Sequence, residues 1–278
     1  MTDTLPPPHV VDIAPCTGEV YDHGAQVVRW APRGADPVLY VSSEVVLRVG
    51  QAVRAGIPVC WPWFGPGRSP GMEPSHGFAR TTTWELVERI DEERSVTFVH
   101  RLADHDATSP HWPHRYAVEL RSRLGADLEV SLTTTNTGAE PFDYEEALHA
   151  YLVVGDIDQV SLDGLVGASF FDKVFGARRQ QTGRVRITGE TDAVYRTDGP
   201  VVVDDPVLER SLEVSTRGMA DMVVWNPWKR KAREAADIGD DDWRHFLCVE
   251  GANVLDDAVA LGAGQSHTST YLLSVKGR

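Results

Sequence analysis

Short β-rich segments recur along almost the whole chain, and turn residues rather than amphipathic helices separate them. The clearest example is a hairpin in which residues 116–124 and 128–135 alternate apolar and polar side chains around Gly125-Ala-Asp127. Alternation with a period of two is typical of half-buried strands. Closely spaced strands without intervening helices favour an antiparallel sandwich or barrel. We therefore expect an all-β fold, a large antiparallel β-sandwich.

The same pattern predicts the other strands and a simple domain organisation. A helix is expected only at residues 229–236, after Asn226-Pro227. The chain has no internal repeat and no low-complexity linker, so residues 1–278 are expected to form a single domain. Residues 1–10, with three consecutive prolines, are expected to be a flexible tail. Further strands are expected at 26–30, 38–42, 44–48, 81–88, 95–101, 142–154, 201–203, 208–214, 222–225, 246–249 and 269–275.

Charge and composition exclude several classes of protein. Lys and Arg number 27 against 41 Asp and Glu, a net charge of −14, which argues against binding to nucleic acid or to a membrane surface. No apolar run reaches the roughly 18 residues of a membrane-spanning helix. The N-terminus lacks the basic and apolar regions of a secretory signal, and three widely spaced cysteines form no disulfide framework or zinc motif. We therefore expect a cytoplasmic protein.

One pair of histidines has a spacing that could hold a metal ion. His111 and His114 stand in a Pro-rich polar segment, His-Trp-Pro-His. Such a pair is more often a solvated turn, because a metal site needs at least three protein ligands. We therefore expect no metal site.

Two residues have the chemistry and the position of an acid–base pair. His149 stands in an apolar run and follows Glu145 and Glu146, either of which could orient the imidazole. Glu250 ends the β-rich segment 245–250, where burial would raise its pKa toward that of a useful base. Histidine titrates near neutral pH and is the most frequent general acid or base. By burial statistics alone, however, both residues are more often structural.

Several cationic and aromatic residues flank glycine-containing turns. Arg54 and Arg80 are two of these, and His76 directly precedes Gly77. A planar guanidinium suits the oxygens of a phosphate or a carboxylate, although structural ion pairs are an equally good interpretation among 41 acidic residues. His76 could donate to a sugar hydroxyl or brace the turn. Aromatic faces could pack on sugar rings, but core packing is the better interpretation for most of Trp61, Trp63, Phe64, Trp225 and Trp228.

Six motifs stand in order along the chain: Arg54-Ala-Gly-Ile-Pro58 with Trp61-Pro-Trp-Phe-Gly65, His76-Gly-Phe-Ala-Arg80, Glu146-Ala-Leu-His-Ala-Tyr151, Thr188-Gly-Glu-Thr-Asp-Ala-Val-Tyr195, Trp225-Asn-Pro-Trp228 and Cys248-Val-Glu-Gly-Ala-Asn253. In this order they resemble the aldose 1-epimerase (mutarotase) superfamily. Within it they resemble the hexose-6-phosphate mutarotases, also called glucose-6-phosphate 1-epimerases. The resemblance extends from about residue 24 to residue 275.

This resemblance implies a fold, a reaction and roles for particular residues. The fold would be the galactose-mutarotase-like supersandwich. The reaction would be the interconversion of the α and β anomers of an aldohexose 6-phosphate by an isomerase that needs no cofactor. His149 would be the general acid and Glu250 the general base. Arg54, Arg80 and Asp192 match substrate-binding positions.

Two further positions and the partners follow from the same resemblance. His76 would contact the substrate, and Ser75 stands where the family often has glutamine, so that contact would differ or pass through a water. The expected partner is a small hexose phosphate, and a monomer is the default. Two alternatives stay open. One is a non-catalytic carbohydrate-binding β-sandwich, and the other is an aldose 1-epimerase for unphosphorylated sugars, which needs no arginine cluster.

Overall fold

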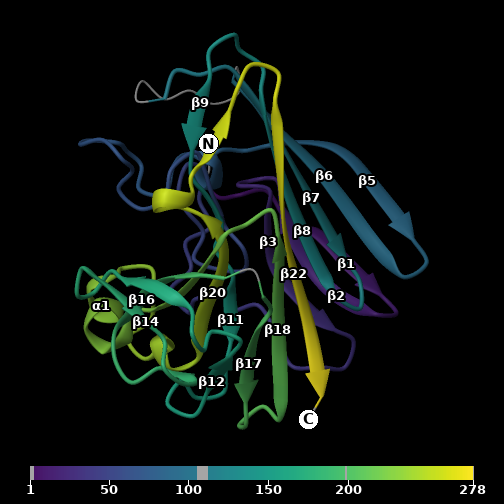
Figure 1. Ribbon diagram of the computed structural model, residues 1–278. Helices are drawn as coiled ribbons and strands as arrows, with labels where there is room; N and C mark the ends of the chain where they lie inside the picture. The colour runs from purple at the N-terminus through teal and green to yellow at the C-terminus, as the bar shows by residue number, and fades with distance from the viewer. Residues whose placement is uncertain (1–2, 105–111, 198, 278) are drawn as a thin grey trace.

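The computed structural model describes residues 3–104, 112–197 and 199–277. His111 therefore lies outside the described residues. Two large antiparallel sheets form most of the molecule (Figure 1). The larger has nine strands in the order β15 (Val185–Arg186), β12 (Ser161–Asp163), β17 (Val201–Asp205), β18 (Arg210–Arg217), β22 (Ser266–Gly277), β8 (Leu128–Asn136), β7 (Tyr116–Leu124), β6 (Ser95–Ala103) and β5 (Glu85–Glu92).

The second large sheet has eight strands. Its path is β14 (Ala177–Gln180), β13 (Ser169–Asp172), β16 (Thr191–Arg196), β19 (Asp221–Asn226), β20 (Phe246–Asn253), β10 (Glu146–Leu148) and β4 (Val59–Cys60), and β11 (Tyr151–Val153) also pairs with β20. Smaller elements complete the fold: β1 (His9–Ile13), β2 (Cys16–Tyr21) and β3 (Gln26–Pro32) in one sheet, β9 (Phe142–Tyr144) with β21 (Val259–Leu261), α1 (Trp228–Glu234), and the 3₁₀ turns Ala79–Thr81, Asp242–Arg244 and Leu255–Asp257.

The two large sheets pack face to face through one hydrophobic core. Leu120 and Leu132 of the nine-stranded sheet belong to the same buried cluster as Val224 and Val249 of the eight-stranded sheet. The Tyr271 hydroxyl of β22 donates to the Val249 carbonyl of β20 at 2.9 Å, so the layers are also joined by a hydrogen bond. The expected all-β sandwich is confirmed, as is the hairpin of β7 and β8, whose buried and partly exposed residues alternate.

The central strand β20 differs from the hairpin because all eight of its residues are buried. Its inner face meets the nine-stranded sheet, and its outer face is covered by loops. A strand covered on both faces reads in sequence as a continuous run rather than as an alternation, which explains the run beginning at Phe246. The polar residues Glu250 and Asn253 are therefore buried within this strand.

Several expected elements differ in the structure. Residues 38–42 and 44–48 form only isolated bridges, namely Leu39 with Leu152, Val41 with Ala55 and Arg48 with Thr4. The strand expected at 81–88 begins at Glu85, after a 3₁₀ turn. Residues 142–154 divide into three short strands. Strands β1, β2 and β12–β16 were not expected from the sequence, while the expected helix at 229–236 is present as α1.

Residues 3–10 also differ from the flexible tail expected for residues 1–10. Leu5 is buried, and its amide donates to the Leu47 carbonyl at 3.1 Å. Strand β1 begins at His9. An apolar side chain among the prolines provides an anchor, since Leu5 packs in a cluster with Tyr21, Val28, Val53 and Ala55.

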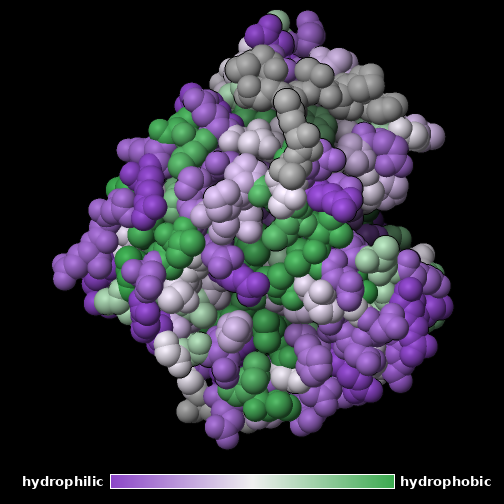
Figure 2. All heavy atoms as spheres, turned by 180° about the vertical axis from the view of Figure 1, so that it is seen from behind, coloured by the Kyte–Doolittle hydropathy of each residue, from purple (hydrophilic) through white to green (hydrophobic). Residues whose placement is uncertain are grey.

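The surface seen from behind the view of Figure 1 carries mainly hydrophilic residues, broken by smaller apolar patches (Figure 2). Within the described ranges, no helix is long and apolar enough to cross a membrane.

Gly56 provides a test of how tightly the loop before β4 is fixed. Its φ is +54°, and a Cβ there would lie 1.9 Å from the Val27 carbonyl oxygen. We expect Gly56→Ala to lower the free energy of unfolding by about 3 kcal/mol or more, because both strain and a backbone clash oppose it. Gly34 also has a positive φ but open space around it, so Gly34→Ala should lose only about 1 kcal/mol. Urea denaturation measures both, and equal losses would contradict the clash.

Candidate active site

A constant antiparallel register places His149 opposite Glu250. Strand β10 pairs with β20 from Glu146↔Asn253 to Leu148↔Gly251, and β11 resumes the same alignment at Tyr151↔Cys248. Continued across the short gap between β10 and β11, that alignment makes His149 and Glu250 cross-strand neighbours. Directly opposed residues have Cβ atoms about 5 Å apart on the same face. The closeness of His149 to Glu250 is therefore a product of strand pairing.

Neighbouring strands extend this pair into two transverse rows on the outer face of the eight-stranded sheet. Val223 of β19 pairs with Glu250. In the next row, Asp192 of β16 pairs with Trp225, which pairs with Cys248 and so leads to Tyr151. The sheet thus presents these side chains at fixed spacing, as a functional site requires.

The two central side chains are in contact. His149 Nε2 lies 3.4 Å from Glu250 Oε1, and the side chains are 7% and 1% exposed. The imidazole stacks on Tyr151 with ring centroids 4.7 Å apart and meets the ring of Trp225 edge-on at 6.0 Å. Aromatic rings on two sides therefore fix the orientation of the histidine.

Burial shifts the pKa values of the two groups in opposite directions. The pKa of Glu250 is raised well above its ordinary value, first by burial and then by the negative charge of Asp192. The pKa of His149 is lowered well below its ordinary value, first by burial and then by His76 and Arg80. Both shifts favour the uncharged form of the group, so the empty cavity disfavours a charged His149–Glu250 pair.

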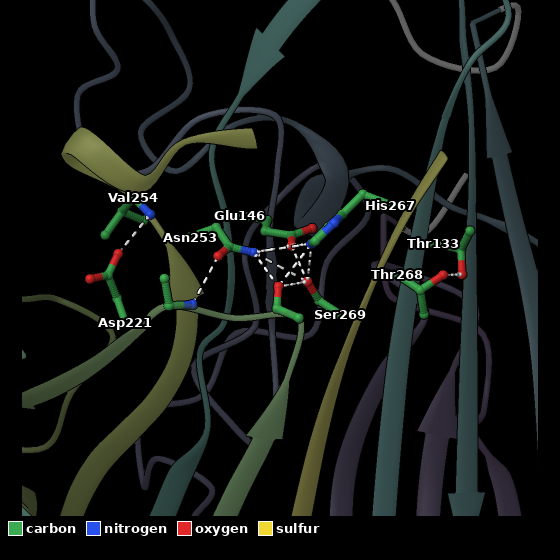
Figure 3. Close-up of polar contacts among 10 residues, drawn as sticks. Thr133, Glu146, Asp221, Asn253, Val254, His267, Thr268 and Ser269 are labelled. Carbon is green, nitrogen blue, oxygen red and sulfur yellow. Dashed lines mark hydrogen bonds and ion pairs between the residues drawn. The ribbon is translucent and has the colours of Figure 1, made fainter. Parts of the chain in front are cut away.

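The inner face of the same strand pair carries a second buried carboxylate, Glu146 (Figure 3). Ser269 Oγ and Asn253 Nδ2 both donate to Glu146 Oε1, the latter at 2.8 Å. His267 Nε2 lies 3.7 Å from the same oxygen, and Asn253 Nδ2 also donates to the Gly218 carbonyl at 2.8 Å. This network joins β10, β20 and β22, so it holds the register that brings His149 to Glu250.

The pair lies at the base of a cavity of about 370 Å³, within the range of small-molecule sites. All seven residues expected from the sequence line it, although their roles stay predictions. Loops supply four of them, and the eight-stranded sheet with its β10–β11 junction supplies the rest. The seven are Arg54, Ser75, His76, Arg80, His149, Asp192 and Glu250.

The two arginines differ in what neutralises them. Arg54 donates twice to Asp237, at 3.1 and 2.9 Å, and once to the Tyr151 hydroxyl at 2.8 Å. Arg80 donates to the Ser75 carbonyl at 2.8 Å, and its buried Nε has no partner among the described residues. No carboxylate of the described residues lies within ion-pair distance of Arg80. Arg80 therefore keeps more of its capacity to bind an anion than Arg54 does.

The loop that carries Ser75 and His76 is held by its backbone. His76 has a φ of +65°, and its amide and carbonyl bond to Gly65 and Trp61 at 2.7 and 3.2 Å. A non-glycine residue in this conformation costs of order 1 kcal/mol and recurs at functional sites. The Ser75 hydroxyl donates to the Gly65 carbonyl at 3.1 Å, so this side chain braces the loop while its carbonyl orients Arg80.

Sequence reasoning missed two charged residues of the cavity. Lys173 follows β13, pairs with Asp192 at 3.2 Å and lies 4.9 Å from the Phe64 ring centroid. Asp237, which follows α1, is the partner of Arg54. Both stand in polar segments that resemble solvated turns, so no sequence signal distinguishes them. Trp225, interpreted as core packing, lines the cavity, whereas Trp61 and Trp63 are buried as expected.

These features define a class: an antiparallel β-sandwich in which a buried histidine–carboxylate pair lines an open cavity. Within that class the chain belongs to the aldose 1-epimerase family, which it matches over residues 13–274. A Salmonella typhimurium protein with the provisional name glucose-6-phosphate 1-epimerase is 35% identical over 230 residues, 82% of this chain and 76% of that protein.

A plant relative and a solved structure extend the comparison. The relative, from Cenchrus ciliaris, has the same provisional name and is 32% identical over 273 residues, 93% of this chain and 81% of that protein. The crystal structure of a provisionally assigned mutarotase from Salmonella typhimurium has a TM-score of 0.90 and 31% identity, covering 97% of this chain and 90% of that one. The expected mutarotase-like fold is confirmed.

The network around Glu146 generates a stability prediction. Asn253→Ala removes a donor from a buried carboxylate and from the Gly218 carbonyl, so we expect a loss of about 2–3 kcal/mol in the free energy of unfolding. Thr133 and Thr268 form a hydrogen bond at 2.9 Å on the exposed face nearby (Figure 3). Thr133→Ala should therefore lose less than about 0.5 kcal/mol. Urea denaturation gives both values, and a neutral Asn253→Ala would show that the network does not hold the register.

Proposed function

We propose that the protein is a hexose-6-phosphate mutarotase that interconverts the α and β anomers of an aldohexose 6-phosphate. The observation that carries this proposal is the contact of His149 with Glu250 at the base of a sugar-sized cavity with three cations at its margin. The names of the relatives support the same reaction. Anomer exchange needs one acid and one base at the ring carbon C1.

The proposed reaction moves two protons and one electron pair. Glu250 removes the proton of the anomeric hydroxyl as the C1–O5 bond breaks and its electron pair passes to the ring oxygen O5. His149 gives that oxygen its proton, and C1 becomes an aldehyde carbon. Rotation about C1–C2 exposes the other carbonyl face. Closure reverses both proton transfers and yields the other anomer.

The pKa shifts favour ring opening. A carboxylate with a raised pKa is a stronger base, and an imidazolium with a lowered pKa is a stronger acid. After ring opening Glu250 is protonated and His149 is neutral, which is the charge state that burial favours in the empty cavity. Before ring opening, the proposed assignment has Glu250 as a carboxylate and His149 as an imidazolium. The hydroxyls of the bound sugar must therefore stabilise this ion pair before the C1–O5 bond breaks.

The phosphate would bind away from the reacting carbon. Arg80 and Lys173 line the cavity, and Arg80 has unused donors. Charge-assisted hydrogen bonds to phosphate are among the stronger ones in proteins. A phosphate bound there would position the ring without taking part in the chemistry.

The catalytic assignment is tested by saturation-transfer NMR of glucose 6-phosphate anomers. We expect His149→Ala and Glu250→Gln each to slow enzymatic exchange by about 10²–10⁴-fold, the usual contribution of a general catalyst. Exchange within a few-fold of wild type in a folded variant would contradict the roles. Wild-type exchange no faster than the buffer blank would refute the activity and leave a carbohydrate-binding protein as the alternative.

A measurement of stability against pH, for wild type and for Glu250→Gln, shows whether the variant is folded. Because the pKa of Glu250 is raised in the folded protein above its ordinary value of 4.5, the folded state binds the proton more tightly than the unfolded state. The contribution of Glu250 to the stability of wild type should therefore fall as the pH rises above about 4.5. A glutamine at position 250 does not titrate. The Glu250→Gln variant should therefore lack this part of the pH dependence and be at least as stable as wild type at pH 7.

Arg80 is the residue that should distinguish phosphorylated from free sugars. Loss of a charge-assisted contact of about 1.5–3 kcal/mol predicts that Arg80→Ala raises KM for glucose 6-phosphate by about 10–100-fold, with little effect on free glucose. Arg68, an exposed arginine outside the cavity that bonds the Leu255 carbonyl, provides the control Arg68→Ala. Equal losses for both sugars in Arg80→Ala would favour an epimerase for unphosphorylated sugars.

A further inference from the structure

Outside the cavity, three metal-ligand side chains converge where the N-terminal sheet meets the nine-stranded sheet. His9 Nε2 lies 2.8 Å from Asp22 Oδ1, and His100 Nε2 lies 3.1 Å from the same oxygen. All three atoms lie within 4.8 Å of one another. His9 begins β1, Asp22 follows β2, and His100 lies in β6.

The spacing suits a first-row transition metal. Bonds of about 2.0–2.2 Å to nitrogen and oxygen place two ligands of a tetrahedral ion about 3.3 Å apart. The two histidine–carboxylate separations, 2.8 and 3.1 Å, are slightly shorter, so a small outward shift of these side chains would admit an ion. Two imidazoles and one carboxylate are a donor set of zinc and related divalent ions.

The cluster is rigid on one side and open on the other. His100 is fully buried, whereas the side chains of His9 and Asp22 are 30% and 37% exposed. The ring centroids of His9 and Phe98 lie 5.5 Å apart. The Asp22 carbonyl accepts from the amides of Ala25 and Trp84 at 3.1 and 2.8 Å. An ion could therefore enter from solvent and keep a water at its open position.

The second coordination shell is incomplete. His100 Nδ1 is buried without a hydrogen-bond partner among the described residues. A ligating histidine usually donates its other N–H to an acceptor, and that support changes affinity by about 10–100-fold. We expect weaker binding here than at a closed structural zinc site.

We propose that His9, Asp22 and His100 form a binding site for a divalent transition-metal ion, such as Zn²⁺ or Co²⁺, that joins β1 to β6. The turn that contains Asp22 also supports the cavity. His23 Nε2 is hydrogen-bonded to the Gln51 carbonyl at 2.8 Å, and the Gly24 amide donates to the Thr82 carbonyl at 2.7 Å. Those two segments lead to Arg54 and Arg80, so the ion would stiffen the margin of the cavity.

The test is a Co²⁺ titration followed by visible absorption, together with thermal unfolding in Zn²⁺ and in chelator. We expect one Co²⁺ per chain with the d–d bands of a nitrogen and oxygen site. Zn²⁺ at a hundredfold excess over its dissociation constant should raise Tm by about 5 °C. Neither readout uses enzyme activity. A negative result for metal binding would therefore leave the proposed mutarotase activity untouched, and the reverse also holds.

Variants assign the ion to this cluster. His9→Gln and Asp22→Asn should each abolish the Co²⁺ bands and the Tm shift. His245→Gln, which removes an exposed histidine bonded to the Gly155 carbonyl, should retain both. Both substitutions are tested because a single variant that failed to fold would give no information about the site.

Three results would overturn the site. One is the absence of Co²⁺ binding to the wild-type protein, and another is full binding in both His9→Gln and Asp22→Asn. The third is an intense thiolate-to-cobalt absorption. Cys248 lies with His149 and Glu250 in the only other three-residue cluster of possible ligands in the described part of the chain, so that absorption would place the ion in the cavity.

Discussion

The alignment of β10 and β11 against β20 is the constraint on which the rest of the site depends. Successive side chains of a strand point to opposite faces, so a slip of one residue would move His149 to the inner face and leave Glu250 without its partner. The alignment is held at one end by the bonds of Asn253 to Glu146 and at the other by the contact of Tyr151 with Arg54. Burial alone would not select this register, because the apolar residues of β20 are covered on both faces.

The two buried carboxylates of this strand pair show how similar burial gives different chemistry. Burial raises the pKa of both Glu146 and Glu250. Glu146 Oε1 accepts hydrogen bonds from Ser269 and Asn253, which fix the position of this side chain, while its Oε2 has no hydrogen-bond partner within the described residues. Glu250 Oε2 likewise has no partner within the described residues, and the difference lies at Oε1, which accepts no bond from a hydroxyl or an amide there and faces His149 at 3.4 Å. A desolvated carboxylate without neutral donors is destabilised in the folded state, and that destabilisation is what would make Glu250 a strong base in the proposed reaction.

The sequence predicts best those parts of the molecule in which local pattern and tertiary environment agree. Alternation in the β7–β8 hairpin reflects a sheet with one buried face, and it predicts both strands to within a residue. Resemblance, rather than pattern, brought Asp192 into the site. Lys173 and Asp237 could not be predicted, because their contacts depend on which loops cover the eight-stranded sheet. Leu5 shows the same limit, since a single apolar residue among prolines gains its partners only from distant segments.

The site divides into a part set by strand pairing and a part set by loops, and the loops are held almost as firmly as the strands. Gly56 lies against the backbone of Val27, and a Cβ at Gly77 would lie 2.0 Å from the Trp61 carbonyl. These close backbone contacts fix the loops that carry Arg54 and Arg80. Asp237 and the Ser75 carbonyl then orient the two guanidinium groups before any ligand binds. Since the two guanidinium groups need little rearrangement, the binding of an anion would cost little free energy for ordering them. Substitutions in the loops can therefore change which ligand the cavity selects without altering the register that aligns His149 with Glu250.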